Sequence, residues 1–169
     1  RMLIFIHSLS AAFALFILFR ILGLQRSTSF FVAIAGVCNQ YIMIFAANGW
    51  FEELFGVTLL PLTVGLLWLA FMKNKIKYAI LAAFFMSLNF LMNSYYVFHY
   101  NVISILWIQA VFGIHLLWKY RKNIFFNQVR LFILIVVSFW AIFIGISAIK
   151  LVPLLEFRAI SARNVVPLQ

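Results

Sequence analysis

Long apolar runs, each separated from the next by a short polar segment, dominate the hydropathy pattern of this chain. The runs cover residues 2–19, 30–47, 54–72, 78–97, 102–118 and 131–149. A helix of about 20 apolar residues crosses the roughly 30 Å hydrocarbon core of a bilayer. The pattern therefore predicts an all-α fold, a polytopic transmembrane helical bundle of about six spans within residues 1–149. Residues 150–169 are predicted to begin a loop.

The composition favours a membrane environment. Hydrophobic residues make up 67% of the chain and charged residues 9%, whereas soluble domains contain about 25% charged residues. So few charges could not cover a surface that faces water. Most of the 21 phenylalanines are therefore expected to face lipid or to pack between helices, in an integral membrane unit with almost no water-soluble part.

Basic residues occur in alternate polar segments, and this alternation predicts an orientation. The first, third and fifth segments contain no acid and hold nine basic residues: Arg20, Arg26, Lys73, Lys75, Lys77, Lys119, Arg121, Lys122 and Arg130. The second and fourth segments contain no basic residue. By the positive-inside rule the basic segments face the cytoplasm, so residue 1 and the tail are non-cytoplasmic. The net charge of +10 thus has a membrane explanation, and we expect no nucleic-acid partner.

A first residue on the non-cytoplasmic side is most simply explained by a further helix upstream of Arg1. We therefore expect the chain to be a fragment of a longer protein, with more chain after residue 169 as well. Such a fragment is expected to be inactive alone.

The polar residues that could do chemistry concentrate toward the non-cytoplasmic side. Glu52 and Glu53 are adjacent carboxylates, which could hold a divalent cation or could be solvated acids of a loop. His99 lies among aromatic residues, where it could contact a substrate or anchor the chain at the membrane interface. Arg158 and Arg163 could bind a phosphate through charge-assisted hydrogen bonds, pair with an acid of the tail or contact lipid headgroups.

Motifs of soluble catalysis are absent from the sequence. It contains no P-loop, HExxH, GxSxG or CxxC pattern. The predicted spans also lack the chain of Asp or Glu residues that proton-coupled pumps use, which weighs against such a transporter.

Four segments stand out together by their order, spacing and predicted sidedness. They are Arg20-Ile21-Leu22-Gly23-Leu24-Gln25-Arg26; Asn48-Gly49-Trp50 with Leu59-Leu60-Pro61-Leu62; the basic turn from Lys73 to Lys77 leading into Ala79-Ile80-Leu81-Ala82-Ala83; and Leu151-Val152-Pro153-Leu154-Leu155-Glu156-Phe157 with Ser161 and Arg163. In these segments the chain resembles the GT-C-type integral membrane glycosyltransferases, and the last segment resembles their YfhO-like branch. One departure is Lys150, where the family pattern often has Gln.

The resemblance implies an enzyme of a bacterial or archaeal cytoplasmic membrane that works on the outer face. Such enzymes pass a sugar from a polyprenyl-phosphate donor to a lipid, glycan or protein acceptor. Their main catalytic aspartate lies in the first external loop, which here would precede residue 1. The resemblance further implies an acidic motif at Glu52 and Glu53, as catalytic residues or as ligands of Mg²⁺ or Mn²⁺. On this hypothesis His99, Arg158 and Arg163 bind the substrate.

Two other functions stay open at this point. A membrane transporter segment would need polar residues along a path through both halves of the membrane, and the cytoplasmic half looks too apolar for that. Substrate accumulation in vesicles without lipid-linked sugar would favour a transporter. A non-catalytic assembly or lipid-binding subunit would keep its activity after changes to the outer polar residues.

Overall fold

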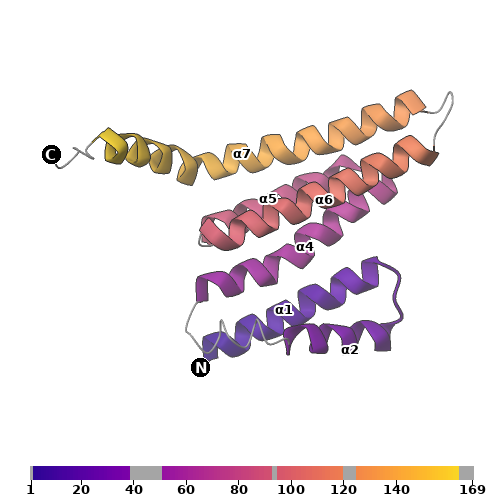
Figure 1. The fold of residues 1–169 in the computed structure, drawn as a ribbon. Helices are drawn as coiled ribbons and strands as arrows, with labels where there is room; N and C mark the ends of the chain where they lie inside the picture. Colours follow the sequence, from indigo (N-terminus) through magenta and orange to yellow (C-terminus); the bar gives the residue numbers. More distant parts are fainter. Residues whose placement is uncertain (1, 39–50, 93–94, 120–124, 164–169) are drawn as a thin grey trace.

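The computed structural model describes residues 2–38, 51–92, 95–119 and 125–163, in which every regular element is a helix (Figure 1). Side chains are described over these ranges except at residues 2–4, 51–57, 95–98, 100, 119, 125 and 157–163. The helices are α1 (Met2–Ile21), α2 (Arg26–Val37), α4 (Phe51–Lys73), α5 (Ile76–Met92), α6 (Tyr95–Lys119) and α7 (Phe125–Arg163). The predicted all-α fold is confirmed for this part of the chain.

Two of the described helices are long and apolar enough to cross a membrane by length and composition. The stretches are Asn101–Trp118 in α6 and Phe126–Glu156 in α7. The apolar stretches of the other four described helices are shorter. The total of about six spans therefore stays a prediction.

Between the predicted runs 78–97 and 102–118 the sequence predicts a turn at residues 99–101, and this prediction is wrong. His99 and Asn101 lie inside α6, which begins at Tyr95. The error arises because a run of polar residues between two apolar runs is typical of a solvent-facing turn. In the structure Asn101 is only 3% exposed, and its side-chain amide donates a hydrogen bond inside the bundle. The polar group is thus satisfied without a break in the helix.

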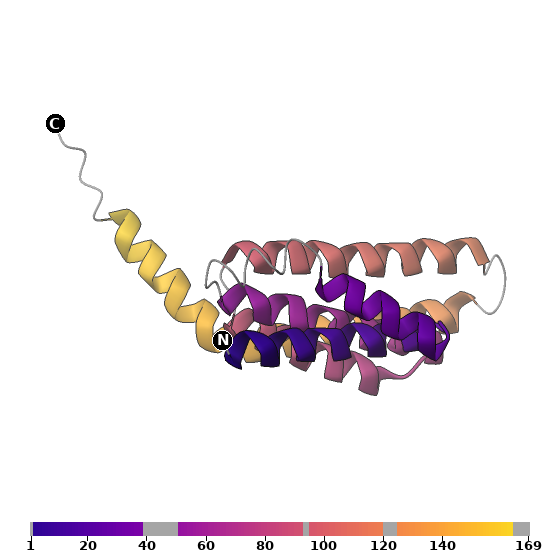
Figure 2. The ribbon, with the colours of Figure 1, turned by 90° about the horizontal axis from the view of Figure 1, so that it is seen from below.

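Residues 150–163, where the sequence predicts the start of a non-cytoplasmic loop, are helical, and their place outside the membrane stays a prediction. These residues continue α7, which has 39 residues and is about 58 Å long at the rise of an α-helix. Pro153 lies inside this helix, where it removes a backbone hydrogen bond and its ring crowds the preceding turn. Figure 2 shows the last part of α7 bending away from the bundle in this region. Proline thus redirects the helix instead of ending it.

The core of the bundle lies where α5 packs against α4 and α7. One face of α5 presents Ala79, Ala82, Ala83 and Met86 at helical spacing, and all four are fully buried. Small side chains on this face let neighbouring backbones approach closely, as in membrane helix pairs. Larger residues of the facing helices fill the remaining space: Leu67 and Phe71 of α4, and Ile135, Phe139 and Phe143 of α7.

Three phenylalanines join α4, α6 and α7 at one side of this core. The Phe71 ring stacks on Phe132 with centroids 5.2 Å apart. It also contacts Phe112, with centroids 4.7 Å apart. Because the three rings come from three helices, they fix the mutual positions of these helices.

The helices α1 and α2 form a hairpin that packs on α4 through α1. Gly23 has φ of +90°, a conformation that favours glycine, and it makes the tight turn between the two helices. Gly65 of α4 lies against α1, because a Cβ built on it would be 3.7 Å from the Leu18 Cα and 3.1 Å from the Ile21 Cδ1. The lack of a side chain at Gly65 therefore permits this close approach of α1 and α4.

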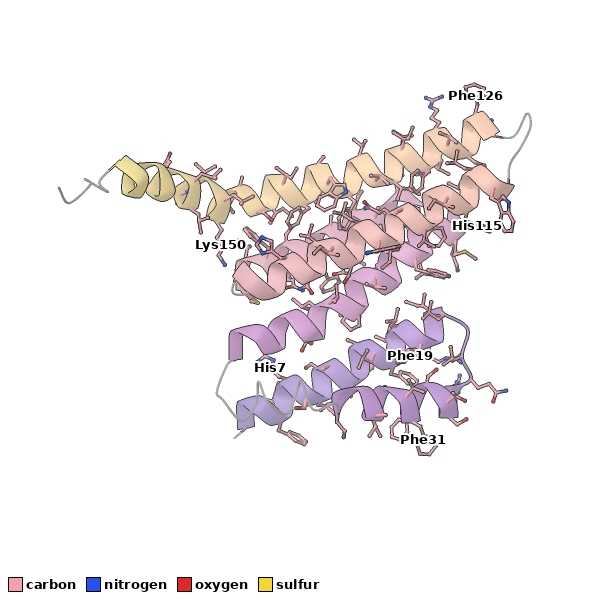
Figure 3. The ribbon with its side chains drawn as sticks, viewed as in Figure 1. His7, Phe19, Phe31, His115, Phe126 and Lys150 are labelled. Carbon is pink, nitrogen blue, oxygen red and sulfur yellow. The ribbon has the colours of Figure 1, made fainter. Side chains whose placement is uncertain are left out.

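Much of the outer surface of the bundle is apolar. Trp118 is 78% exposed, Phe126 83% and Phe31 71%. Figure 3 shows Phe31 and Phe126 pointing away from the helices that carry them. Soluble monomers rarely expose contiguous apolar patches larger than a few hundred Å².

Candidate functional site

The residues predicted to act in catalysis have well-defined places along the helices. Glu52 and Glu53 are the second and third residues of α4, and their side chains lie outside the described residues. Acids in a first helical turn interact favourably with the helix dipole, which is a structural role open to them. Their catalytic and metal-binding roles stay predictions.

The predicted substrate-binding residues are divided between two helices. His99 lies near the start of α6 and is exposed. Arg158 and Arg163 belong to the part of α7 beyond Pro153 (Figure 2), and their side chains are outside the described residues. The start of α4, the start of α6 and the bend of α7 all lie at the same end of the bundle (Figure 1). Among the residues that the structure describes, no group of three His, Cys, Asp or Glu could hold a metal ion.

A cluster of buried and partly buried polar side chains, which we call the polar cluster, lies near this same end, where α5, α6 and α7 meet. Its members are Ser87, Asn89, Asn101, Ser147 and Lys150. The first four are at most 3% exposed. Buried polar groups in an apolar bundle require hydrogen-bond partners, so these contacts decide how the three helices meet.

Asn89 and Asn101 connect α5 to α6. The Asn101 Nδ2 donates a hydrogen bond to the Asn89 Oδ1 over 3.1 Å. Asn89 is fully buried. Two amides twelve residues apart, one in an apolar run and the other in the polar segment that follows it, were the available sequence signal for this pair.

Lys150 connects α7 to the end of α5. Its Nζ donates hydrogen bonds to the backbone oxygens of Phe90, at 3.0 Å, and Leu91, at 3.2 Å. The same ammonium lies 5.3 Å from the centre of the Phe90 ring. Because α5 ends at Met92, these carbonyls belong to its last turn, which lacks intrahelical donors and carries the negative end of the helix dipole. Lys150 therefore caps α5 at the point where α7 bends (Figure 3).

Ser87 and Ser147 lie between α5 and α7. The Ser87 Oγ lies 2.8 Å from the Ala83 backbone oxygen and 3.4 Å from that of Phe143. The Ser147 Oγ is buried and makes no hydrogen bond to the described residues. Both residues are small, and they continue the close contact that Ala79, Ala82 and Ala83 of α5 make possible.

Gln109 forms a separate polar contact about 12 Å further along α6 than Asn101. The Trp140 Nε1 donates a hydrogen bond to its Oε1 over 3.0 Å. Because an indole N–H can only donate, this contact fixes the orientation of the amide. The Gln109 Nε2 is buried and has no hydrogen-bond partner within the described structure.

The opposite end of the bundle, which we call the basic end, carries exposed positive charge. It is the end at which α1, α4 and α6 finish and α2, α5 and α7 start (Figure 1). The exposed basic side chains described there are Arg20, Arg26, Lys73, Lys75, Lys77 and Arg130. The three acids of the sequence, Glu52, Glu53 and Glu156, are all distant from it along their helices. Toward the other end these three acids are accompanied by Lys150, Arg158 and Arg163, so the excess of positive charge is concentrated at the basic end.

Sequence reasoning missed the two contacts that organise the polar cluster. It placed Asn101 in a turn and Lys150 in a tail, so neither was expected inside a helix interface. Comparison of the chain with protein families, with curated proteins and with solved structures gives no match.

Proposed function

We propose that this chain is a polytopic membrane-embedded bundle whose basic end faces the cytoplasm. The observation that carries the proposal is the basic end itself, where six described basic side chains are exposed. Cytoplasmic connections of membrane proteins are enriched in Lys and Arg in this way. On this orientation the polar cluster and the start of α4 lie toward the non-cytoplasmic surface.

The surface between the two ends supports this environment. Exposed Trp107, Ile114 and Leu117 line α6, and exposed Ile133, Val137 and Ile144 line α7. Water would disfavour such surfaces, whereas acyl chains match them. The 23 residues of α4 and the 25 of α6 correspond to lengths of about 35 to 38 Å, enough for the hydrocarbon core of a bilayer.

We further propose that the full-length protein transfers a sugar from a polyprenyl-phosphate donor at the non-cytoplasmic surface. The support is the resemblance of four segments to GT-C-type glycosyltransferases, together with the helix ends that carry the candidate residues. Glu52 and Glu53 start α4 and His99 lies one turn into α6, at the same end of the bundle (Figure 1). That end is opposite the basic end.

The proposed reaction is a displacement at the anomeric carbon of the donor sugar. An acceptor hydroxyl or amide forms the new bond to this carbon and loses its proton to a carboxylate, while the bond to the polyprenyl phosphate breaks. Glu52 or Glu53 would take the proton or hold Mg²⁺ or Mn²⁺. Arg158 or Arg163 would stabilise the negative charge on the departing phosphate.

A substitution experiment tests the assignment. Glu52→Gln combined with Glu53→Gln in the full-length protein is expected to reduce sugar transfer by about 100-fold or more, because a general base or metal ligand is lost. Glu156→Gln is the matched control, since Glu156 is the remaining acid of the sequence and lies beyond Pro153. Unchanged transfer in the double variant at normal expression would remove both carboxylates from the site.

Chelation separates the two roles of the carboxylates. If they hold a metal ion, EDTA abolishes transfer and added Mg²⁺ or Mn²⁺ restores it. If they act only as a base, transfer survives EDTA, and the double variant stays inactive at every metal concentration. Substrate accumulation in vesicles that lack lipid-linked sugar would instead indicate a transporter.

A further inference from the structure

A groove between α1 and α2 runs along the outer surface of the hairpin. Its wider part has a volume of about 230 Å³ and is lined by Leu9, Phe13, Phe30 and Ile34, with other small and aromatic residues. A second part of about 190 Å³ shares Leu9 and Ile34 and continues to Phe5. The two parts are therefore continuous and form a single groove along the hairpin.

The walls of this groove are apolar and exposed. Phe5, Leu9 and Phe13 of α1 are 68%, 62% and 65% exposed, and Phe30 of α2 is 55% exposed. The floor of the wider part includes Ala12 and Ala33, whose short side chains leave the space open. The groove thus fits a long, narrow and fully apolar ligand.

Both helices that form the groove carry an arginine where the groove reaches the basic end of the bundle. Arg20 lies one helical turn beyond the lining residue Phe16, and Arg26 lies one turn before Phe30. Residues four apart share one face of a helix, so each arginine continues the face that lines the groove. Both arginines are exposed.

Further features of the turn between the helices suit a negatively charged group. The Arg20 Nη1 donates one hydrogen bond to the Leu24 backbone oxygen, and a guanidinium has five N–H donors in all. α2 begins at Arg26 with no side-chain hydrogen bond from its N-cap residue Gln25. The first N–H groups of a helix and its dipole attract anions. Planar guanidinium groups also bind phosphate with two parallel hydrogen bonds.

We propose that this groove binds an anionic phospholipid, with an acyl chain between α1 and α2 and the headgroup phosphate at Arg20 and Arg26. The proposal rests on the membrane embedding proposed above, and it concerns a different end of the bundle from the proposed sugar transfer. The lipid belongs to the leaflet that the basic end faces. Charge at one end of the groove and an apolar lining along the rest match the two parts of a phospholipid.

Native mass spectrometry of the full-length protein in micelles with equal amounts of dioleoylphosphatidylglycerol and dioleoylphosphatidylcholine tests the site. The wild-type protein is expected to retain the anionic lipid at least fivefold more than the neutral one. Arg20→Gln combined with Arg26→Gln is expected to abolish this preference. The matched control is Lys73→Gln with Lys75→Gln, which removes the same charge at the basic end, outside the groove lining, and is expected to keep it.

Variants of the lining test the acyl part of the site. Ala12→Leu fills the groove and Phe13→Ala removes one wall, so both are expected to lower retention of both lipids. Phe13 is exposed, so its variant tests the site even where Ala12→Leu disturbs folding. If the lysine control loses the preference for phosphatidylglycerol as fully as the arginine variant does, the proposal is overturned. It is also overturned if both lining variants retain the two lipids as well as the wild-type protein does. Displacement of the lipid by glycerol phosphate would overturn it too, because it would indicate headgroup binding alone.

Carbonate extraction of the protein from vesicles separates this proposal from the one on which it rests. Extraction of the wild-type protein would overturn the membrane embedding and the lipid site together. Retention in the vesicles with no preference for phosphatidylglycerol would overturn the lipid site alone.

Discussion

The Lys150 ammonium, at the bend of α7, donates a hydrogen bond to the Phe90 backbone oxygen in the last turn of α5, over 3.0 Å. A lysine inside an apolar helix needs a partner that offsets the loss of its hydration. The carbonyls of Phe90 and Leu91 need donors, because α5 ends at Met92. Each partner thus satisfies the other, and the contact ties the bend of α7 to the end of α5.

Replacement of Lys150 by Met is expected to destabilise the bundle by about 1–3 kcal/mol, because the carbonyls at the end of α5 lose a charged donor. Lys150→Arg is expected to retain most of the stability, since it keeps charge and donors. Lys75→Met, at an exposed position of the α4–α5 turn, is the control and is expected to change stability by less than about 0.5 kcal/mol. Denaturant titration in micelles measures all three. An equal loss in the control would contradict the capping role.

The buried amide pair predicts coupled effects. Asn89→Leu or Asn101→Leu alone removes the buried hydrogen bond between the two amides and is expected to cost about 1–3 kcal/mol. The double variant is expected to cost less than the sum of the single changes, with a coupling of about 0.6 kcal/mol or more. A double-mutant cycle measures this coupling.

A second cycle supplies the control for the amide pair. It combines Asn89→Leu with Asn127→Leu, because Asn127 is an exposed residue near the start of α7. Additive effects are expected there. Additivity in the Asn89–Asn101 cycle as well would mean that the 3.1 Å contact contributes nothing to stability.

Two glycines predict opposite responses to added side chains. Gly145→Ala is expected to stabilise α7 by about 0.5–1 kcal/mol, because a Cβ there meets nothing within 4 Å and Ala favours a helix. Gly65→Leu is expected to destabilise by about 1–3 kcal/mol, because even a Cβ would lie 3.1 Å from the Ile21 Cδ1. Thermal unfolding in micelles measures both changes. A stabilising Gly65→Leu would contradict the close packing of α1 on α4.

The helices could be predicted from the sequence because their apolar runs are long and have clear polar boundaries. The predicted run 54–72 and the described α4, Phe51–Lys73, differ by three residues at one end and one at the other. The prediction failed where a polar residue finds its partner in another helix. Neither the contact between Asn101 and Asn89 nor the contact between Lys150 and Phe90 leaves a periodic signal in a single sequence.

For the candidate site, the sequence predicts at which end of the bundle some residues lie, but it does not predict how those residues are arranged in space. The pattern of apolar runs predicts that consecutive helices alternate in direction. The start of α4 and the start of α6 are therefore expected at the same end of the bundle. The direction of the chain after Pro153 does not follow from it, since a proline can end a helix or bend it. The positions of Arg158 and Arg163 therefore depended on the structure.

Cysteine labelling tests the proposed orientation directly. In a Cys38→Ser background, which removes the cysteine of the sequence, Lys75→Cys and His99→Cys each place one thiol at an exposed position. A membrane-impermeant maleimide added to right-side-out vesicles is expected to label residue 99 and to leave residue 75 unlabelled until the vesicles are permeabilised. The reason is that basic connections stay on the cytoplasmic side during insertion. Reversed labelling would invert the orientation and move the candidate carboxylates to the cytoplasmic side, whereas labelling of both positions from outside would exclude a bundle that spans the membrane between them.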